Sequence, residues 1–142
     1  MSDGFDRWSD RVDAQKFTAI EGSTVISAEE ADLFGEAAVV VVTTLGTLRL
    51  FHTNDCCESV ELIDGESDLP AIVGGVVHEF RESYSDGDPL DGSDESYTWT
   101  LYTITTDKGD VTLRWFGSSN GYYGERIDAY WTPTPANTEA QP

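Results

Sequence analysis

Apolar and polar residues alternate along much of the chain, which is the pattern of β-strands with one buried face. Two neighbouring segments show it most clearly, residues 96–106 (SYTWTLYTITT) and residues 111–117 (VTLRWFG). The residues DKGD lie between them, and Gly109 can adopt the positive φ that tight turns require. These segments predict a β-hairpin. Other alternating or continuously apolar runs predict strands at 16–27, 37–44, 47–53, 59–64, 76–83 and 122–131.

One segment has helical end signals instead. In residues 27–35 (SAEEADLFG), Ser27 is followed three residues later by Glu30, as in a capping box, and Gly35 stands where a helix commonly stops. The pattern predicts one short helix there. The predicted fold class is therefore mainly β, all-β to α+β, with a single antiparallel-sheet domain and one short helix.

The boundaries of this domain follow from composition. Residues 1–16 are polar and predict a flexible N-terminal arm, and residues 17–131 hold the β-rich pattern. Within the domain, residues 83–96 are mostly small or acidic and predict a solvated insertion loop. The proline-containing residues 132–142 predict a disordered tail.

The formal net charge of −19 narrows the classes of partner. Lys16 and Lys108 are the only lysines, so a long nucleic acid and an anionic membrane surface are both disfavoured. No run reaches the ~20 apolar residues of a membrane span, and the polar start is unlike a signal peptide. Cys56 and Cys57 are adjacent and cannot join distant segments. We expect a cytoplasmic protein, in the host cell cytoplasm if a phage encodes it.

Catalytic motifs carry little weight in this sequence. Residues 117–121 match G-x-S-x-G, but a nucleophile elbow needs a turn from a strand into a helix, and a strand is predicted to follow. The acidic runs at 64–68 and 86–91 lack the spacing of an EF-hand loop, and the adjacent cysteines are a poor zinc pair. We therefore expect no catalytic residue, no metal, no cofactor and no enzymatic activity.

A polar turn between aromatic residues is the best candidate for a binding site. Arginine grips phosphate, asparagine reads a base edge or a sugar, and aromatic rings stack on bases. The alternative is a plain hairpin whose arginines pair with local carboxylates. The candidate ligand-binding residues are Arg114, Phe116, Ser118, Ser119, Asn120, Tyr122, Tyr123 and Arg126.

Two segments carry a resemblance to a known family. Residues 54–66 (NDCCESVELIDGE) and residues 96–128 resemble small, mostly uncharacterised bacteriophage and bacterial proteins with Asp-Cys-Cys-Glu and Ser-Asn-Gly-Tyr-Tyr motifs. That family is similar to the Thoeris anti-defence sponge proteins, which bind cyclic ADP-ribose-type or cyclic oligonucleotide immune signals without cleaving them. The resemblance implies a β-rich homo-oligomer with pockets between protomers and a small phosphorylated nucleotide as ligand.

The acidic surface opposes an anionic ligand, so local geometry has to outweigh it. Charges farther away than about 8 Å are screened at physiological salt, whereas a desolvated charge-assisted hydrogen bond contributes about 1.5–3 kcal/mol. Local geometry outweighs the global charge only if Arg114 or Arg126 is not already neutralised by a neighbouring Asp or Glu. We therefore expect a nucleotide-signal-binding sponge protein. One alternative is an acidic protein–protein inhibitor that mimics nucleic acid, and another is a small metal-dependent hydrolase.

Overall fold

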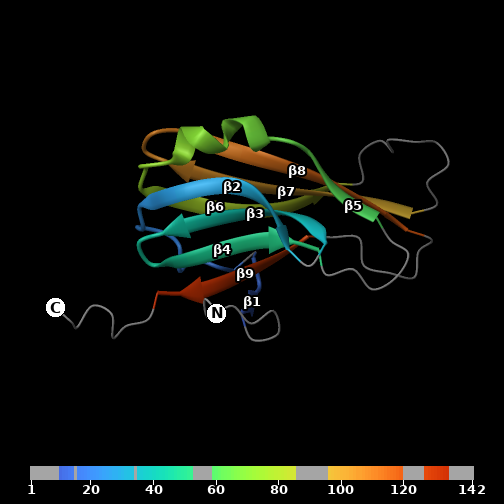
Figure 1. The fold of residues 1–142 in the computed structure, drawn as a ribbon, viewed down its shortest axis with the longest axis horizontal. Helices are drawn as coiled ribbons and strands as arrows, with labels where there is room; N and C mark the ends of the chain where they lie inside the picture. Colours follow the sequence, from blue (N-terminus) through green and yellow to red (C-terminus); the bar gives the residue numbers. More distant parts are fainter. Residues whose placement is uncertain are drawn as a thin grey trace.

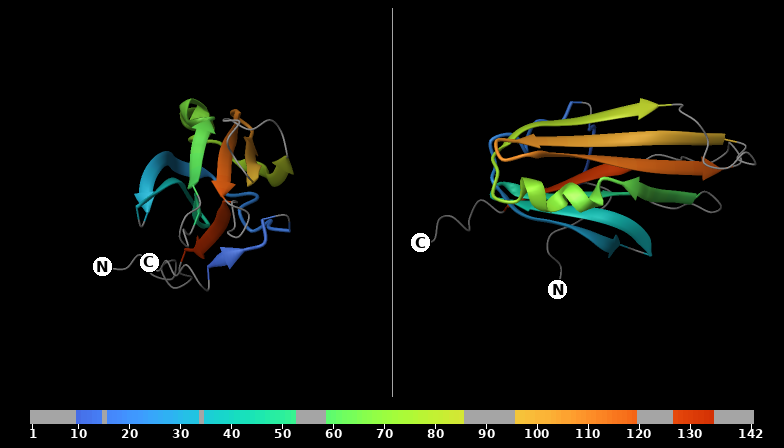
Figure 2. Two further views of the ribbon diagram at one scale, coloured as in Figure 1. Left: turned by 90° about the vertical axis from the view of Figure 1, so that its right-hand side faces the viewer. Right: turned by 90° about the horizontal axis from the view of Figure 1, so that it is seen from above.

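The protein folds into two antiparallel β-sheets that lie face to face (Figures 1 and 2). This computed structural model describes residues 10–14, 16–33, 35–52, 59–85, 96–119 and 127–134. The predicted mainly β, antiparallel fold with one short helix is confirmed, and its strands divide between two sheets. The strands are β1 (Arg11–Val12), β2 (Val25–Leu33), β3 (Glu36–Thr43), β4 (Gly46–Phe51), β5 (Ser59–Asp64), β6 (Val77–Ser85), β7 (Ser96–Thr106), β8 (Asp110–Ser119) and β9 (Asp128–Pro133).

The chain crosses between the sheets twice. The first sheet has the order β1-β9-β4-β3-β2, and the second has the order β5-β8-β7-β6. Strands β2, β3 and β4 are consecutive neighbours, as are β6, β7 and β8, so each sheet is built around a simple meander. Strand β9 returns to the first sheet and lies between β4 and β1.

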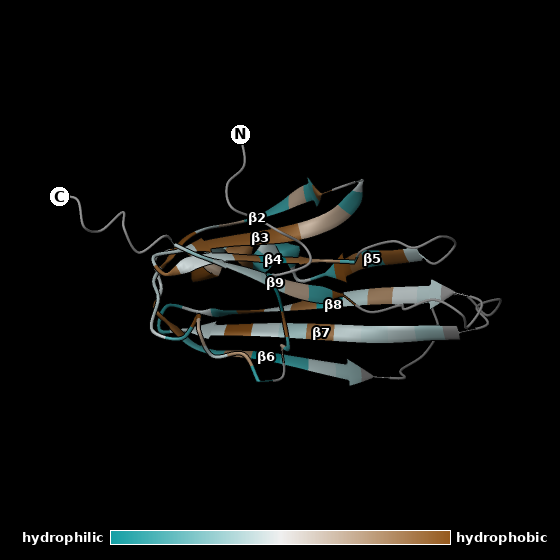
Figure 3. Cartoon of the chain, turned by 90° about the horizontal axis from the view of Figure 1, so that it is seen from below, coloured by the Kyte–Doolittle hydropathy of each residue, from teal (hydrophilic) through white to brown (hydrophobic). Residues whose placement is uncertain are grey.

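The hydrophobic core fills the space between the sheets. Strand β3 is apolar along most of its length, as Figure 3 shows, because alanine and valine continue through it. Its buried side chains belong to the same core cluster as those of the β7–β8 hairpin from the other sheet. The fully buried members of this core include Val39, Val41, Leu48, Leu50, Tyr102, Ile104, Leu113 and Trp115.

The prediction of a helix at residues 27–35 is wrong, because residues 27–33 lie in strand β2. It pairs in antiparallel register with β3, for example Glu30 with Val39. The strong β-forming sequence of β3 offers a neighbouring ladder, and this pairing outweighs the local capping signature. Gly35 does adopt a left-handed conformation, with φ of 82°, but it turns a hairpin, and its N–H donates to Asp32 Oδ1 at 2.9 Å.

The short helix is found elsewhere, as the 3₁₀-helix η1 (Glu66–Ile72), which Figure 1 shows along the upper edge. It buries Leu69 and Ile72, and it packs between β2 and β8. Beyond it, Val25 N–H donates to Gly75 O at 2.9 Å, so the start of β2 is tied to the segment that enters β6. Helix η1 therefore covers the opening between the two sheets on this side.

Several predicted boundaries shift in the structure. Residues 19–22 form turns, so the first part of the strand predicted at 16–27 is wrong. Strand β1 lies within the predicted N-terminal arm, and β6 continues to Ser85, inside the predicted insertion loop. Strand β9 continues to Pro133, inside the predicted tail. Residues 1–9, 86–95 and 135–142 lie outside the described residues, as do Cys56 and Cys57.

Candidate functional site

The β7–β8 hairpin presents one face to the core and the other to the outside of the second sheet. On β7, Thr100, Tyr102 and Ile104 point inward and are fully buried. The residues between them therefore point outward, because successive side chains of a strand alternate. In the register, Trp99 lies opposite Phe116, and Leu101 lies opposite Arg114.

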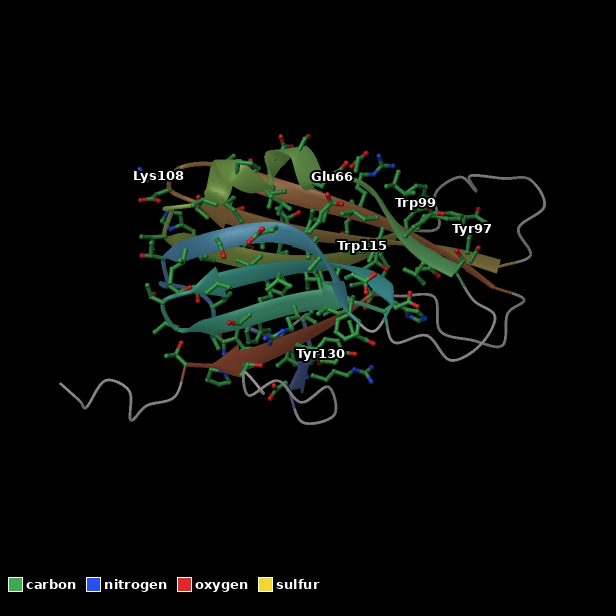
Figure 4. All side chains as sticks on the ribbon, viewed as in Figure 1. Glu66, Tyr97, Trp99, Lys108, Trp115 and Tyr130 are labelled. Atoms are coloured by element: carbon green, nitrogen blue, oxygen red, sulfur yellow. The ribbon has the colours of Figure 1, made fainter. Side chains whose placement is uncertain are left out.

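Three rings gather on this outer face. Figure 4 shows two of them, Tyr97 and Trp99, toward the end of the molecule away from Lys108. The rings of Trp99 and Phe116 meet edge to face with centroids 4.9 Å apart, and those of Tyr97 and Phe116 are stacked at 5.8 Å. Trp99 and Phe116 are only 6% and 4% exposed, although neither belongs to the core between the sheets. The outer face thus carries an apolar cluster of its own.

Arg114 joins this cluster to a carboxylate. Its Cζ lies 4.8 Å from the centre of a Trp99 ring, within cation–π distance, and its Nη1 donates to Asp64 Oδ2 at 2.7 Å. A β-bulge between Leu62 and Asp64 makes this pair, because regular pairing would place residue 63 opposite Arg114. We call Asp64, Tyr97, Trp99, Arg114 and Phe116 the outer-face cluster.

This ion pair is partly solvated, since the Arg114 and Asp64 side chains are 44% and 52% exposed. Exposed ion pairs contribute about 0–1 kcal/mol to stability, so the pairing orients the guanidinium more than it stabilises the fold. For Arg114 the structure therefore shows the alternative that the sequence left open, an arginine paired with a local carboxylate. Arg114 reaches a ligand only by sharing its donors with Asp64 or by using the remaining ones.

The structure brings together part of the predicted ligand-binding set. Arg114 and Phe116 lie in the outer-face cluster, and Ser118 lies opposite Tyr97 near the end of β8. Ser119 ends β8, but its side chain lies outside the described residues. The same holds for Asn120, Tyr122, Tyr123 and Arg126.

Three residues of the serine motif are in a strand. Strand β8 runs through Gly117, Ser118 and Ser119, so this part of the predicted polar turn is extended instead. A nucleophile elbow requires a sharp turn at its serine, and Ser119 belongs to a ladder with Ser96 instead. Among the described residues, no group of three His, Cys, Asp or Glu side chains is arranged to hold a metal ion.

Sequence reasoning missed three members of the outer-face cluster, Asp64, Tyr97 and Trp99. Tyr97 and Trp99 could have been predicted from the sequence. Once the turn at 107–109 is placed, the hairpin register sets Tyr97 opposite Ser118 and Trp99 opposite Phe116. Asp64 could not have been predicted, because its position depends on a bulge in a strand that is distant in sequence.

A second arginine–aromatic group on the outer face of the first sheet was also missed. Arg49 is only 6% exposed, and its Nη1 donates to Thr132 Oγ1 at 3.0 Å. Thr132 Oγ1 in turn donates to Asp10 Oδ2 at 2.7 Å. The rings of Phe51 and Tyr130 stack with centroids 4.7 Å apart on the same sheet. Side-chain alternation in the strand predicted at 47–53 puts Arg49 and Phe51 on one face, but it does not show that this face is buried.

A buried tyrosine links the sheets beneath the hairpin. Tyr102 Oη contacts Glu82 Oε2 on β6 at 2.5 Å and Ile127 O, just before β9, at 2.8 Å. Tyr84 Oη donates to the other oxygen of Glu82 at 2.6 Å. Burial, with a smaller contribution from Glu82, raises the pKa of Tyr102 far above the ordinary value of a phenol. Tyr102 is therefore a neutral hydrogen-bond donor rather than an acid or base.

The fold and this site define a two-sheet antiparallel β protein with an arginine-centred aromatic cluster on one outer face. The chain belongs to the family described as Domain of unknown function (DUF7448), whose model matches residues 11–129. No curated protein and no solved structure matches the chain. The match agrees with the expected membership of an uncharacterised family, and it does not test the similarity to the Thoeris anti-defence sponge proteins. Among the described residues, no helix is long and apolar enough to cross a membrane.

Proposed function

We propose that the protein binds a small phosphorylated nucleotide at the outer-face cluster and sequesters it without cleaving it. The observation that supports this is the position of Arg114, between the Asp64 carboxylate and the ring of Trp99. Guanidinium, carboxylate and aromatic groups are the three chemistries that a nucleotide engages, through its phosphate, its hydroxyl groups and its base.

Each group of the cluster has a distinct task in this proposal. Arg114 lies over Trp99 with its side chain 44% exposed, so its guanidinium plane offers a surface on which a base can stack. Its donors beyond the one given to Asp64 bind a phosphate oxygen. Asp64, itself 52% exposed, accepts hydrogen bonds from ribose hydroxyls or a base amino group. Trp99 is buried and lies beneath the Arg114 guanidinium, and the buried Phe116 packs against Trp99.

The Asp64 pair narrows the class of ligand. A bare phosphate would have to approach a carboxylate in a chain of net charge −19, which is unfavourable at short range. A ligand that brings hydroxyl groups to Asp64 together with a phosphate to Arg114 avoids this conflict. Cyclic nucleotides and cyclic ADP-ribose-type molecules have this combination.

Calorimetric titration with a panel of cyclic mononucleotides, cyclic oligonucleotides and cyclic ADP-ribose-type molecules tests the proposal. We expect one of them to bind, and Arg114→Gln to weaken its binding by roughly 10- to 100-fold, as expected for one charge-assisted hydrogen bond. Arg81→Gln is the matched control, because Arg81 lies on the same sheet, is 66% exposed and also pairs with a carboxylate, Glu79. If the whole panel is ignored at tens of micromolar, or if both variants lose binding equally, the proposal is wrong.

Sequestration without cleavage needs a separate measurement. After binding, the protein is heat-denatured and the released ligand is identified by mass spectrometry. Intact ligand supports a sponge, and a cleaved product supports a phosphodiesterase. The mass of the native protein with and without ligand tests the homo-oligomer with pockets between protomers that the resemblance implies.

A second candidate function is an acidic inhibitor that mimics nucleic acid and blocks a basic protein. The observation that favours it is a set of exposed carboxylates on strand β2 and helix η1. These two elements pack against each other. The far part of β2 is largely hydrophilic in Figure 3. The residues are Glu29, Glu30, Asp32, Glu66 and Asp68. Capture of a basic protein from host lysate that is lost at high salt would support this function, since charge pairing is screened by salt.

A further inference from the structure

Two buried polar atoms of the β7–β8 hairpin have no hydrogen-bond partner among the described residues. They are Oγ1 of Thr100 and Nε1 of Trp115. Thr100 is 0% exposed and Trp115 is 1% exposed, and the two residues lie directly opposite each other in the register. Figure 4 shows Trp115 well inside the outline of the two sheets.

Leaving both atoms without partners would be costly. An indole N–H can only donate, and a threonine hydroxyl can donate and accept. A buried polar group without a partner loses its hydrogen bonds to water and gains nothing in exchange, so native proteins rarely contain one. Two such atoms on opposed residues point to a shared partner.

The burial limits the size of that partner. Directly opposed residues in an antiparallel sheet have Cβ atoms about 4.5–5.5 Å apart, so the Thr100 and Trp115 side chains start from neighbouring positions on the inner face of the hairpin. Because both residues are enclosed, the molecule must fit without exposing either one. A buried water molecule typically makes two to four hydrogen bonds in such sites.

We propose that a single water molecule is bound inside the protein between Thr100 and Trp115. It accepts a hydrogen bond from Trp115 Nε1–H and donates one to Thr100 Oγ1. Thr100 and Trp115 directly adjoin Trp99 and Phe116 in sequence, so the water lies under the part of the hairpin that carries the outer-face cluster. Its role is to hold the two strands in register there, and this role does not depend on the proposed ligand.

The sign of one mutational effect tests the proposal. Thr100→Val keeps the shape and the β-branching but removes the hydroxyl. With the water present, the variant breaks a satisfied network, and we expect the unfolding equilibrium constant to rise about five- to tenfold, as for the loss of one hydrogen bond. Without the water, the variant removes an orphaned hydroxyl, so the equilibrium constant would stay the same or fall. That result would overturn the proposal.

Thr103→Val is the matched control on the same strand. The Thr103 hydroxyl lies on the outer face, 3.1 Å from the hydroxyl of Thr112, and is exposed to solvent. We expect its unfolding equilibrium constant to change by less than about twofold. An equal loss in the two variants would contradict the proposal, because the effect would then belong to threonine replacement in general.

A direct measurement is available from the indole group. In a sample labelled with ¹⁵N at tryptophan, the Trp115 Nε1–H resonance is expected to show a cross-relaxation peak to a long-lived water. The peak should disappear or weaken in Thr100→Val, which leaves the indole itself in place. A Trp115 resonance without any water peak in the unmodified protein would refute the bound water.

Discussion

Removal of the Tyr102 hydroxyl is the sharpest test of how the two sheets are joined. The oxygen lies 2.5 Å from Glu82 Oε2 and 2.8 Å from Ile127 O, so it connects β6 of the second sheet to the segment entering β9 of the first. Tyr102→Phe keeps the ring and its stacking on Phe80, whose centroid lies 5.5 Å away. The variant therefore isolates the hydroxyl.

The expected loss of free energy of unfolding follows from the number of hydrogen bonds that the Tyr102 phenol can donate. A phenol has one proton and two acceptors here, so it makes one full hydrogen bond or shares one between them. A hydrogen bond to a carboxylate contributes about 1.5–3 kcal/mol, and loss of the donor also leaves the buried Ile127 carbonyl without this partner. We expect Tyr102→Phe to lower the free energy of unfolding by about 2–3 kcal/mol, or the melting temperature by about 6–10 °C.

Urea denaturation at neutral pH measures this change, and the same series at higher pH tests its origin. The raised pKa of Tyr102 keeps the phenol protonated in the folded protein, while the unfolded chain ionises near pH 10. The contribution of Tyr102 to the free energy of unfolding is therefore fully present below pH 10. Above pH 10 this contribution falls by about 1.4 kcal/mol per pH unit. Tyr102→Phe should remove that share of the alkaline loss.

Two results would refute this reasoning. A loss of less than about 0.5 kcal/mol at neutral pH would mean that the hydroxyl does not join the sheets. An alkaline slope that is unchanged in Tyr102→Phe would mean that other groups are responsible for it.

Two further predictions concern turns. Gly65 has a φ of 107°, and a Cβ there would collide with the carbonyl oxygen of Thr112, so Gly65→Ala should lower the free energy of unfolding by more than about 3 kcal/mol. Gly22→Ala, with φ of 88° and open space around it, should cost only about 1–2 kcal/mol; equal costs in thermal melts would argue against the collision. Thr106→Val should cost about 1–3 kcal/mol in urea denaturation, because the Thr106 hydroxyl donates to Gly109 O at 2.6 Å and accepts from two turn N–H groups; an unchanged stability would contradict that bonding.

Local pattern was sufficient for the β7–β8 hairpin. Its two strands alternate clearly, and its turn has a glycine and short polar residues, so strand, turn and facing could all be read from adjacent residues. This explains why the core residues Ile104, Leu113 and Trp115 were foreseeable. It also explains why the pairing of Trp99 with Phe116 could have been derived before the structure was known.

Residues 27–35 show where local pattern fails. Ser27, Glu30 and Gly35 are genuine end signals for a helix, worth about 1 kcal/mol or less each. They are outweighed by a complete ladder of backbone hydrogen bonds to β3 and by the burial that this ladder allows. A competition between weak local preferences and strong nonlocal pairing cannot be scored from the segment alone.

The candidate site also has a part that the local sequence pattern predicts and a part that only the assembled sheet decides. Strand alternation already placed Arg114 and Phe116 together on a face opposite to that of Trp115, because side-chain direction in a strand depends only on position along it. Whether Arg114 is paired depended on the packing of β5 against β8 and on a bulge of one residue that brings Asp64 opposite it. Contacts between segments fifty residues apart in the chain arise only when the sheet is assembled, because no local preference encodes which strand becomes the neighbour.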